Sequence, residues 1–234
     1  MKVIETRNLS KIYNPDKVPV HALNGVNLAI ERGEFTAIVG PSGSGKTTLL
    51  NIIGGLDNPT SGSVVVEGTE IAKLEGNALI NFRLHNIGFV FQAYNLIPVL
   101  TAKENVEFVM LLQTRPKGER EARIMALLEA VGLSDKTDKR PSELSGGQQQ
   151  RVAVARALAS KPKFVLADEP TANLDSISAE NLLDIMLKLN QEENMTFIFS
   201  THDARVIRRA RRVVTLEDGR IKKDLVQNEV SINF

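Results

Sequence analysis

Short apolar runs alternate along this chain with stretches that have helical spacing. Val26–Ile30 alternates apolar and polar residues, as a half-buried strand does, and Phe35–Val39 is almost continuously apolar, as a buried parallel strand is. Helical patterns predict helices at residues 46–55, 179–189 and 204–210. Further apolar runs predict strands at 64–66, 87–91, 164–167, 196–199 and 212–216, the last in a terminal hairpin with the segment after Gly219. The pattern is that of an α/β protein.

Residues 101–133 interrupt this alternation with a purely helical pattern. Thr101 followed by Glu104 matches a capping box at a helix start. The charged segment Lys117–Glu121 is expected to lie exposed between two helices, whose apolar positions are Val106, Val109 and Met110, then Ile124, Leu127, Leu128 and Val131. We therefore expect a helical subdomain at about 93–160 within a single domain that covers residues 1–234.

Composition excludes several classes of protein. The 234 residues suffice for a sizeable core, and the net charge of +1 gives no reason to expect nucleic acid as a partner. The absence of cysteine excludes disulfides and thiol nucleophiles. Neither a signal peptide nor an apolar run long enough for a membrane span is recognised, so we expect a soluble protein whose membrane role would require a partner. The last ten residues carry little pattern and are expected to fray.

A glycine-rich loop follows the predicted strand Phe35–Val39 and precedes a predicted helix. Gly40-Pro41-Ser42-Gly43-Ser44-Gly45-Lys46-Thr47 matches the full Walker A pattern in its proper context. Its glycines allow backbone amides to point at phosphates. Lys46 is predicted to reach the β- and γ-phosphates, and Thr47 to offer its hydroxyl to Mg²⁺.

Polar residues stand at the ends of three other predicted strands, where ligands of parallel sheets bind. Asp168 and Glu169 follow the strand at 164–167, and we predict that Asp168 helps to hold Mg²⁺ while Glu169 acts as general base. His202 follows the strand at 196–199 and is predicted to contact the γ-phosphate. Gln92 follows the strand at 87–91 and is predicted to ligate Mg²⁺ or to orient water.

A second helix start is also suited to an anion. In Leu144-Ser145-Gly146-Gly147-Gln148, two glycines after a serine open a helical run, and the first amides of a helix attract phosphate. One chain with two different phosphate-binding helix starts is best explained if each serves a different copy of the protein.

Together, these motifs resemble the nucleotide-binding subunits of ATP-binding cassette (ABC) transporters, in order and spacing, over nearly the whole chain. The resemblance implies a P-loop NTPase (RecA-like) core with an antiparallel β subdomain and a helical subdomain that carries the signature loop Ser145–Gln148. It implies that Tyr13 stacks on adenine, that Glu169 is the base and His202 the switch histidine, and that Asp175 belongs to a loop crossing the interface of an ATP-sandwich dimer. The nucleotide-binding set is Tyr13, Gly40, Pro41, Ser42, Gly43, Ser44, Gly45, Lys46, Thr47, Thr48, Gln92, Ser145, Gly146, Gly147, Gln148 and Asp175.

Within the family, Phe89–Pro98 and Leu144–Ala153 are similar to the lipoprotein-release and macrolide-export branch. That branch implies a transmembrane permease as a separate partner, export or extraction of a lipoprotein, peptide or drug-like substrate, and a place on the cytoplasmic face of the inner membrane. Ala172, where that branch commonly has glycine, is a mild departure, and Thr137–Glu143 disfavours a fused multidrug exporter. The surface around Leu96, Ile97, Val99 and Leu100 is a candidate groove for a permease helix.

Two other classes remain as alternatives. Soluble relatives that act in DNA repair or translation carry a long coiled coil or two cassettes, and neither fits this chain. A non-hydrolysing regulator is disfavoured by the intact Lys46, Glu169 and His202. The transported substrate is not readable from the sequence.

Overall fold

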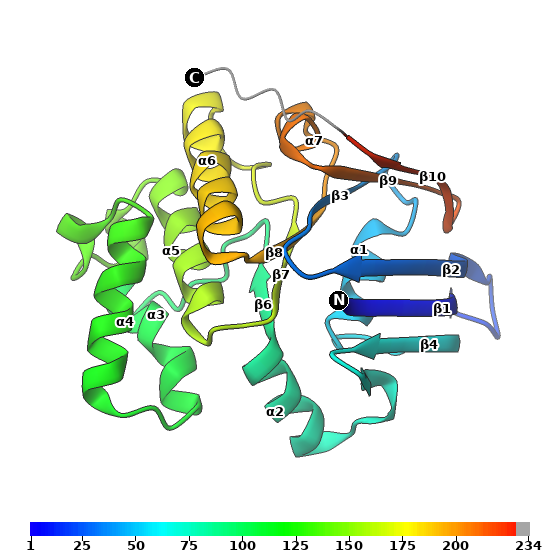
Figure 1. Cartoon of the computed structure of the whole chain (residues 1–234), viewed down its shortest axis with the longest axis horizontal. Helices are drawn as coiled ribbons and strands as arrows, with labels where there is room; N and C mark the ends of the chain where they lie inside the picture. The colour runs from blue at the N-terminus through cyan, green and yellow to red at the C-terminus, as the bar shows by residue number, and fades with distance from the viewer. Residues whose placement is uncertain (228–234) are drawn as a thin grey trace.

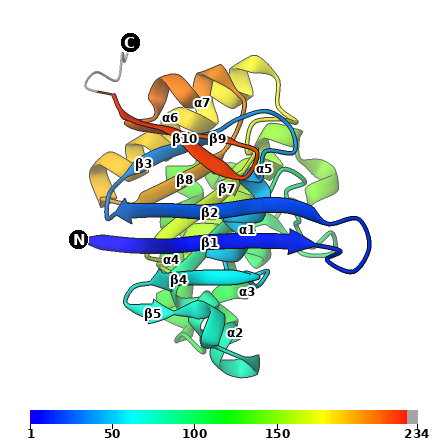
Figure 2. The same ribbon diagram turned by 90° about the vertical axis from the view of Figure 1, so that its right-hand side faces the viewer.

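The computed structural model describes residues 1–227, which form two sheets with helices between and beside them (Figure 1). The smaller sheet is antiparallel, in the order β2-β1-β4-β5, and consists of β1 (Lys2–Tyr13), β2 (Val20–Glu31), β4 (Ser61–Val66) and β5 (Thr69–Glu70). Figure 2 shows this sheet from its outer side. The antiparallel subdomain expected beside the core is therefore present.

The larger sheet has the order β10-β9-β3-β8-β7-β6. Neighbouring strands from β9 to β6 are parallel, and β10 pairs antiparallel with β9 through the predicted hairpin. Its strands are β3 (Phe35–Val39), β6 (Ile87–Val90), β7 (Phe164–Asp168), β8 (Thr196–Ser200), β9 (Arg212–Glu217) and β10 (Arg220–Val226). The parallel strands β3, β7 and β8 end side by side, since Ile38 and Asp168 both pair with Ser200.

Helices cover both faces of this parallel sheet. Helix α1 (Lys46–Ile53) packs between the two sheets, where Leu49 and Ile53 are fully buried in one hydrophobic cluster with residues of both. A second cluster joins the other face to α3 (Ala102–Leu112), α4 (Lys117–Ala130), α5 (Gly146–Ala159) and α6 (Ser176–Glu193). These four helices lie on the side opposite the antiparallel sheet (Figure 1). The remaining helices within residues 1–227 are α2 (Gly76–Asn86), α7 (Ala204–Arg209) and three 3₁₀ turns at Ile71–Lys73, Ser134–Lys136 and Pro141–Glu143.

The helix start at Thr101 is as predicted, whereas the segment Lys117–Glu121 is not. Thr101 and Glu104 form the predicted capping box, in which Thr101 Oγ1 accepts from the Glu104 amide and Glu104 Oε2 accepts from the Thr101 amide. The placement of Lys117–Glu121 between two helices was wrong, because this segment forms the first turns of α4. Its charged side chains therefore surround the start of a helix rather than a loop. The segment is exposed or partly exposed, as expected. The predicted fraying of the last ten residues falls largely on 228–234, which lie outside the described residues.

Candidate active site

The Walker loop connects β3 to α1, and two of its glycines stand where a side chain would clash with neighbouring backbone. Gly40 has a φ of 153°, and an added Cβ would lie 2.0 Å from the Leu216 carbonyl oxygen. Gly45 has a φ of 102°, and its Cβ would lie 2.3 Å from the Ala22 carbonyl oxygen. Glycine is therefore required at both positions. Lys46 reaches back over the loop, and its Nζ donates to the carbonyl oxygens of Gly40 and Pro41 at 2.8 and 3.0 Å.

A cavity of about 710 Å³ opens above this loop, within the range of small-molecule sites. Most predicted nucleotide-binding residues line it together with both predicted catalytic strand-end residues: Tyr13, Gly40, Pro41, Ser42, Gly43, Gly45, Lys46, Thr47, Thr48, Gln92, Glu169 and His202. Ser44, in the same loop, is buried and does not line the cavity. Val20, His21, Ala22 and Ala172 complete the lining. Sequence reasoning missed the first three, which belong to no motif and are brought there by strand β2.

Tyr13 is held at the edge of this cavity by two side chains that the sequence did not single out. Its hydroxyl donates to Asp57 Oδ2 at 2.7 Å, and Lys11 Nζ lies 4.8 Å from the centre of its ring while donating to Asp57 Oδ1. Burial and the hydrogen bond to Asp57 raise the pKa of Tyr13. The ring is thus fixed in place as a neutral platform.

Thr47, which lines the cavity, is in contact with Asp168 at the end of β7. Thr47 Oγ1 lies 3.1 Å from both carboxylate oxygens of Asp168, because α1 begins beside the end of β7. Hydroxyl and carboxylate oxygens are ligands that Mg²⁺ accepts. Within residues 1–227 no cluster of three His, Cys, Asp or Glu side chains is arranged for a metal. Mg²⁺ would therefore depend on additional oxygens from water and phosphate, which is its usual mode in nucleotide sites.

Glu169 and His202 are in contact at the ends of β7 and β8. His202 Nδ1 lies 2.8 Å from Glu169 Oε1, and Thr201 Oγ1 donates to Glu169 Oε2 at 3.2 Å. The Glu169 side chain is only 17% exposed, whereas His202 is 76% exposed. A carboxylate that accepts two hydrogen bonds still has lone pairs free to accept a proton from water.

The second predicted phosphate site lies elsewhere in the chain. Ser145 caps α5 in a capping box, with its Oγ accepting from the Gln148 amide while Gln148 Oε1 accepts from the Ser145 amide. A Cβ on Gly147 would lie 2.8 Å from Ser178 Oγ, so this helix start packs closely against α6. Asp175 caps α6, because its Oδ1 accepts from the Ser178 amide. Hydrogen bonds from Ser178 lower the pKa of the Asp175 carboxyl. None of Ser145–Gln148 or Asp175 lines the Walker cavity.

A phosphate loop with an acid pair and a histidine at neighbouring strand ends defines a nucleoside triphosphatase of the P-loop class. Comparison with known proteins extends this conclusion. Residues 23–172 match the ABC transporter family. An ABC transporter ATP-binding protein of Thermotoga maritima is 49% identical, over 94% of this chain and 94% of its own length. The chain thus belongs to the ABC transporter family, as an ATP-binding and ATP-hydrolysing subunit.

Solved structures agree with this assignment. The ATP-binding cassette MJ0796 of Methanocaldococcus jannaschii, in a dimeric post-hydrolysis state bound to ADP and Pi, is similar with a TM-score of 0.88 at 43% identity; 97% of this chain and 99% of that chain are covered. The expected P-loop NTPase fold is therefore confirmed. The macrolide export ATP-binding/permease protein MacB of Mannheimia succiniciproducens is 45% identical over 99% of this chain, which spans only 36% of that protein's length.

Proposed function

We propose that two copies of this chain bind two ATP molecules between them, each held by Gly40–Thr48 of one copy and Ser145–Gln148 of the other. The observation that carries this proposal is that the glycine-led helix start at Ser145 lies off the cavity of its own chain, although the first amides of a helix attract anions. The dimeric form of MJ0796 supports it. In this proposal residues 1–234 act as one nucleotide-binding domain, with a helical subdomain at about 93–160 that presents Ser145 to the partner copy.

The chemistry follows from the side chains at the cavity. The Tyr13 ring stacks on adenine, and Lys46 neutralises charge on the phosphates. Glu169 accepts a proton from the attacking water, whose oxygen bonds to the γ-phosphorus while the bond to the ADP oxygen breaks. His202 contacts the γ-phosphate and, through its bond to Glu169, orients the base. Ser145 and the amides that follow it stabilise the transferred phosphate from the partner copy, and Asp175 belongs to the loop at the same interface.

We further propose Mg²⁺ as the cofactor. Thr47 and Asp168, whose side-chain oxygens lie 3.1 Å apart, would hold it, and Gln92, which lines the same cavity on an exposed loop, is the third candidate ligand. Bound Mg²⁺ would neutralise charge that develops on the β- and γ-phosphate oxygens.

The partner of the dimer is a separate transmembrane permease. No helix within residues 1–227 is both long and apolar enough to cross a bilayer. An apolar cavity of about 770 Å³ lies between α2, β6, α3 and α5, and Ile80, Phe108 and Leu112 line it. Of the predicted groove residues only Ile97 lines this cavity; Leu96 packs against the core and Val99 is exposed. We propose that a permease helix docks here.

This docking would place the dimer at the cytoplasmic face of the membrane. Likeness to MacB favours export of a drug-like, peptide or lipoprotein substrate over action in DNA repair or translation. Nucleic acid is not expected as a partner, because the basic run near α7 is largely neutralised: Arg205 pairs with Asp203, Arg209 with Asp184, and Arg212 with Glu34 and Asp224.

The test is Glu169→Gln, which keeps the shape of the side chain and removes its basicity. Release of phosphate from MgATP should fall by at least about a hundredfold, the usual contribution of a general base, while binding of ATP by the isolated chain is retained. Lys46→Ala is the matched control that should lose binding itself. A Glu169→Gln chain that turned over ATP at the wild-type rate would exclude Glu169 as the base.

A further inference from the structure

Thr201 is a fully buried hydroxyl in contact with the proposed base. It follows β8 directly, and its Oγ1 donates to Glu169 Oε2 at 3.2 Å. We propose that Thr201 is a positioning residue for hydrolysis, which fixes the orientation of the Glu169 carboxylate toward the attacking water. This proposal rests on the role of Glu169 proposed above.

The hydroxyl of Thr201 is immobile for structural reasons. Its backbone amide donates to the Ile38 carbonyl oxygen at 3.1 Å, which ties it to β3, the strand that leads into the Walker loop. Its Oγ1 accepts from the Asp203 amide at 3.0 Å. Because that amide supplies a proton to the oxygen, the hydroxyl's own hydrogen is left for the Glu169 carboxylate. A β-branched side chain in a closed site also has few rotamers.

The Glu169 side chain, in contrast, keeps one orientation only if other groups hold its carboxylate. It has three rotatable bonds, and its backbone is left-handed with a φ of 44°. The amide of Glu169 donates to the Ser200 carbonyl oxygen at 2.9 Å, which fixes the backbone and leaves the carboxylate to be fixed by its own contacts. Of the two groups on that carboxylate, His202 is largely exposed and Thr201 is buried. Thr201 is therefore the rigid one, and misplacing a reacting group by about 1 Å can cost about a hundredfold in rate.

A purely structural role for Thr201 can be separated from a positioning role by comparison with Thr171. Thr201 also supports the turn at Asp203, and so does Thr171, whose Oγ1 donates to Asp203 Oδ2 at 2.6 Å. Thr171 is nearly fully buried too. Removing the Thr171 hydroxyl thus loosens the same turn without removing a bond to Glu169, which makes Thr171→Val a matched control.

The experiment compares kcat and KM for MgATP in Thr201→Val, Thr201→Ser and Thr171→Val. We expect Thr201→Val to lower kcat by about tenfold or more, equivalent to about 1.4 kcal/mol, with KM within about twofold of wild type. Thr201→Ser, which keeps the hydroxyl, should restore kcat to within about threefold, and Thr171→Val should lower thermal stability much more than kcat. Thr201→Ala also lacks the hydroxyl and serves in place of the valine variant if that chain does not fold.

Three outcomes would overturn the proposal: kcat unchanged in both hydroxyl-free variants, Thr201→Ser as slow as Thr201→Val, or Thr171→Val as slow as Thr201→Val. Glu169→Gln, measured in parallel, separates this failure from that of the proposed function. If Glu169→Gln is inactive and Thr201→Val is normal, only the positioning role fails. If Glu169→Gln remains active, the base assignment fails as well.

Discussion

Glu169 shows how individual residues are fixed by the sheet. Its left-handed backbone costs roughly 1–3 kcal/mol in a non-glycine residue, and such strain persists only where the surroundings enforce it. Its backbone is held by two hydrogen bonds, from its amide to the Ser200 carbonyl oxygen and from the Ala172 amide to its own carbonyl oxygen. Its carboxylate is held by groups after β8, the Thr201 hydroxyl and the His202 ring. The parallel pairing of β7 with β8 thus determines where the carboxylate of the proposed base lies.

Tyr13 provides a prediction at the same scale. Tyr13→Ala should weaken binding of MgATP by about tenfold or more, because stacking of a base on an aromatic ring contributes roughly 1–3 kcal/mol. Tyr13→Phe keeps the ring and loses only the hydrogen bond to Asp57, so its effect should be smaller. Titration calorimetry with a non-hydrolysable ATP analogue measures both. Equal losses in the two variants would mean that the hydroxyl, not the ring, determines affinity.

Secondary-structure elements differ in how well they can be predicted from the sequence. Strand β3 was predicted over its full length because it is a buried parallel strand with a nearly continuous apolar run. Helix α2 was missed because it has no buried residue in this chain and therefore no apolar stripe. Long-range contacts between single polar residues were also missed: nothing in the local pattern says that Thr201 meets Glu169, or that Asp57 meets Tyr13. The motifs located the cavity, whereas its supporting contacts depend on tertiary packing.

The N-terminus of α7 gives a prediction at the scale of an element. Burial works to raise the pKa of its cap, Asp203, but hydrogen bonds from Arg205 and Thr171 outweigh this and lower it from 3.8 to about 2. A lowered carboxyl pKa stabilises the fold above the unfolded value of 3.8, and that stability is lost as the pH falls toward 2. Asp203→Asn, which can still cap the helix, should therefore cost roughly 2 kcal/mol at neutral pH, with roughly half of this remaining at pH 3.

Urea unfolding of both chains at neutral pH, at pH 5 and at pH 3 measures this difference. It should be constant between the first two conditions and smaller at the third. A difference independent of pH would show that the charge of Asp203 does not stabilise the helix start.

Two regions of the molecular surface are proposed to bind two different kinds of partner. The Walker cavity and the Ser145 helix start are the surfaces proposed to meet a second copy, and the apolar cavity beside α2 and α3 is the surface proposed to meet the permease. Helix α5 connects the two, because it begins at Ser145 and carries Arg156 and Ala157 in the apolar cavity. Arg156 also donates to the carbonyl oxygens of Tyr94 and Asn95, in the loop after Gln92. Movement of α5 would therefore displace residues at both surfaces.

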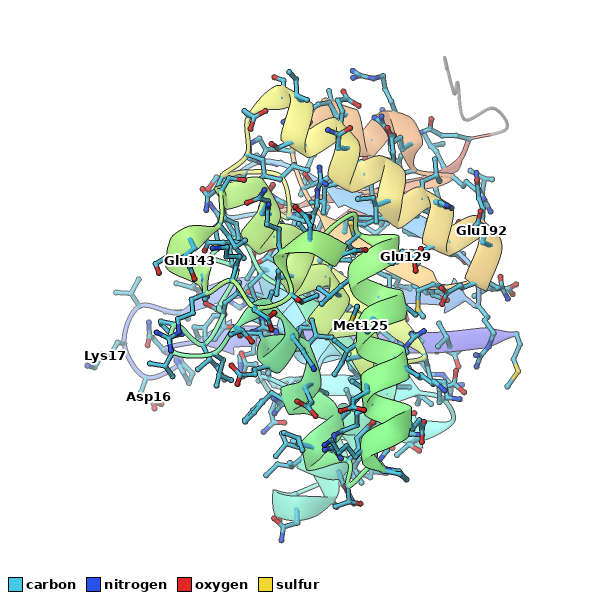
Figure 3. All side chains as sticks on the ribbon, turned by 90° about the vertical axis from the view of Figure 1, so that its left-hand side faces the viewer. Asp16, Lys17, Met125, Glu129, Glu143 and Glu192 are labelled. Carbon is cyan, nitrogen blue, oxygen red and sulfur yellow. The ribbon has the colours of Figure 1, made fainter. Side chains whose placement is uncertain are left out.

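Phe108→Glu tests the permease surface. A carboxylate in this apolar cavity should weaken association with the membrane subunit by more than about tenfold, while ATPase activity of the isolated chain is unchanged. Met125→Glu is the matched control, because Met125 is an exposed apolar residue on α4 outside the cavity, on the outer side of the helical region (Figure 3). Co-purification of each variant with the membrane subunit in detergent is the measurement. Equal binding by Phe108→Glu and wild type would exclude this cavity as the docking site.

The central claim is that each active site is shared between two copies, and the mass of the ATP-bound species tests it most directly. In a Glu169→Gln background, MgATP should convert the 25.7 kDa chain to a species of twice that mass in light scattering after gel filtration. Adding Ser145→Arg should keep the chain at 25.7 kDa while its affinity for ATP stays within about twofold, because the Walker loop is untouched. A dimer that still formed with Ser145→Arg, or loss of ATP binding by that monomer, would contradict a shared site.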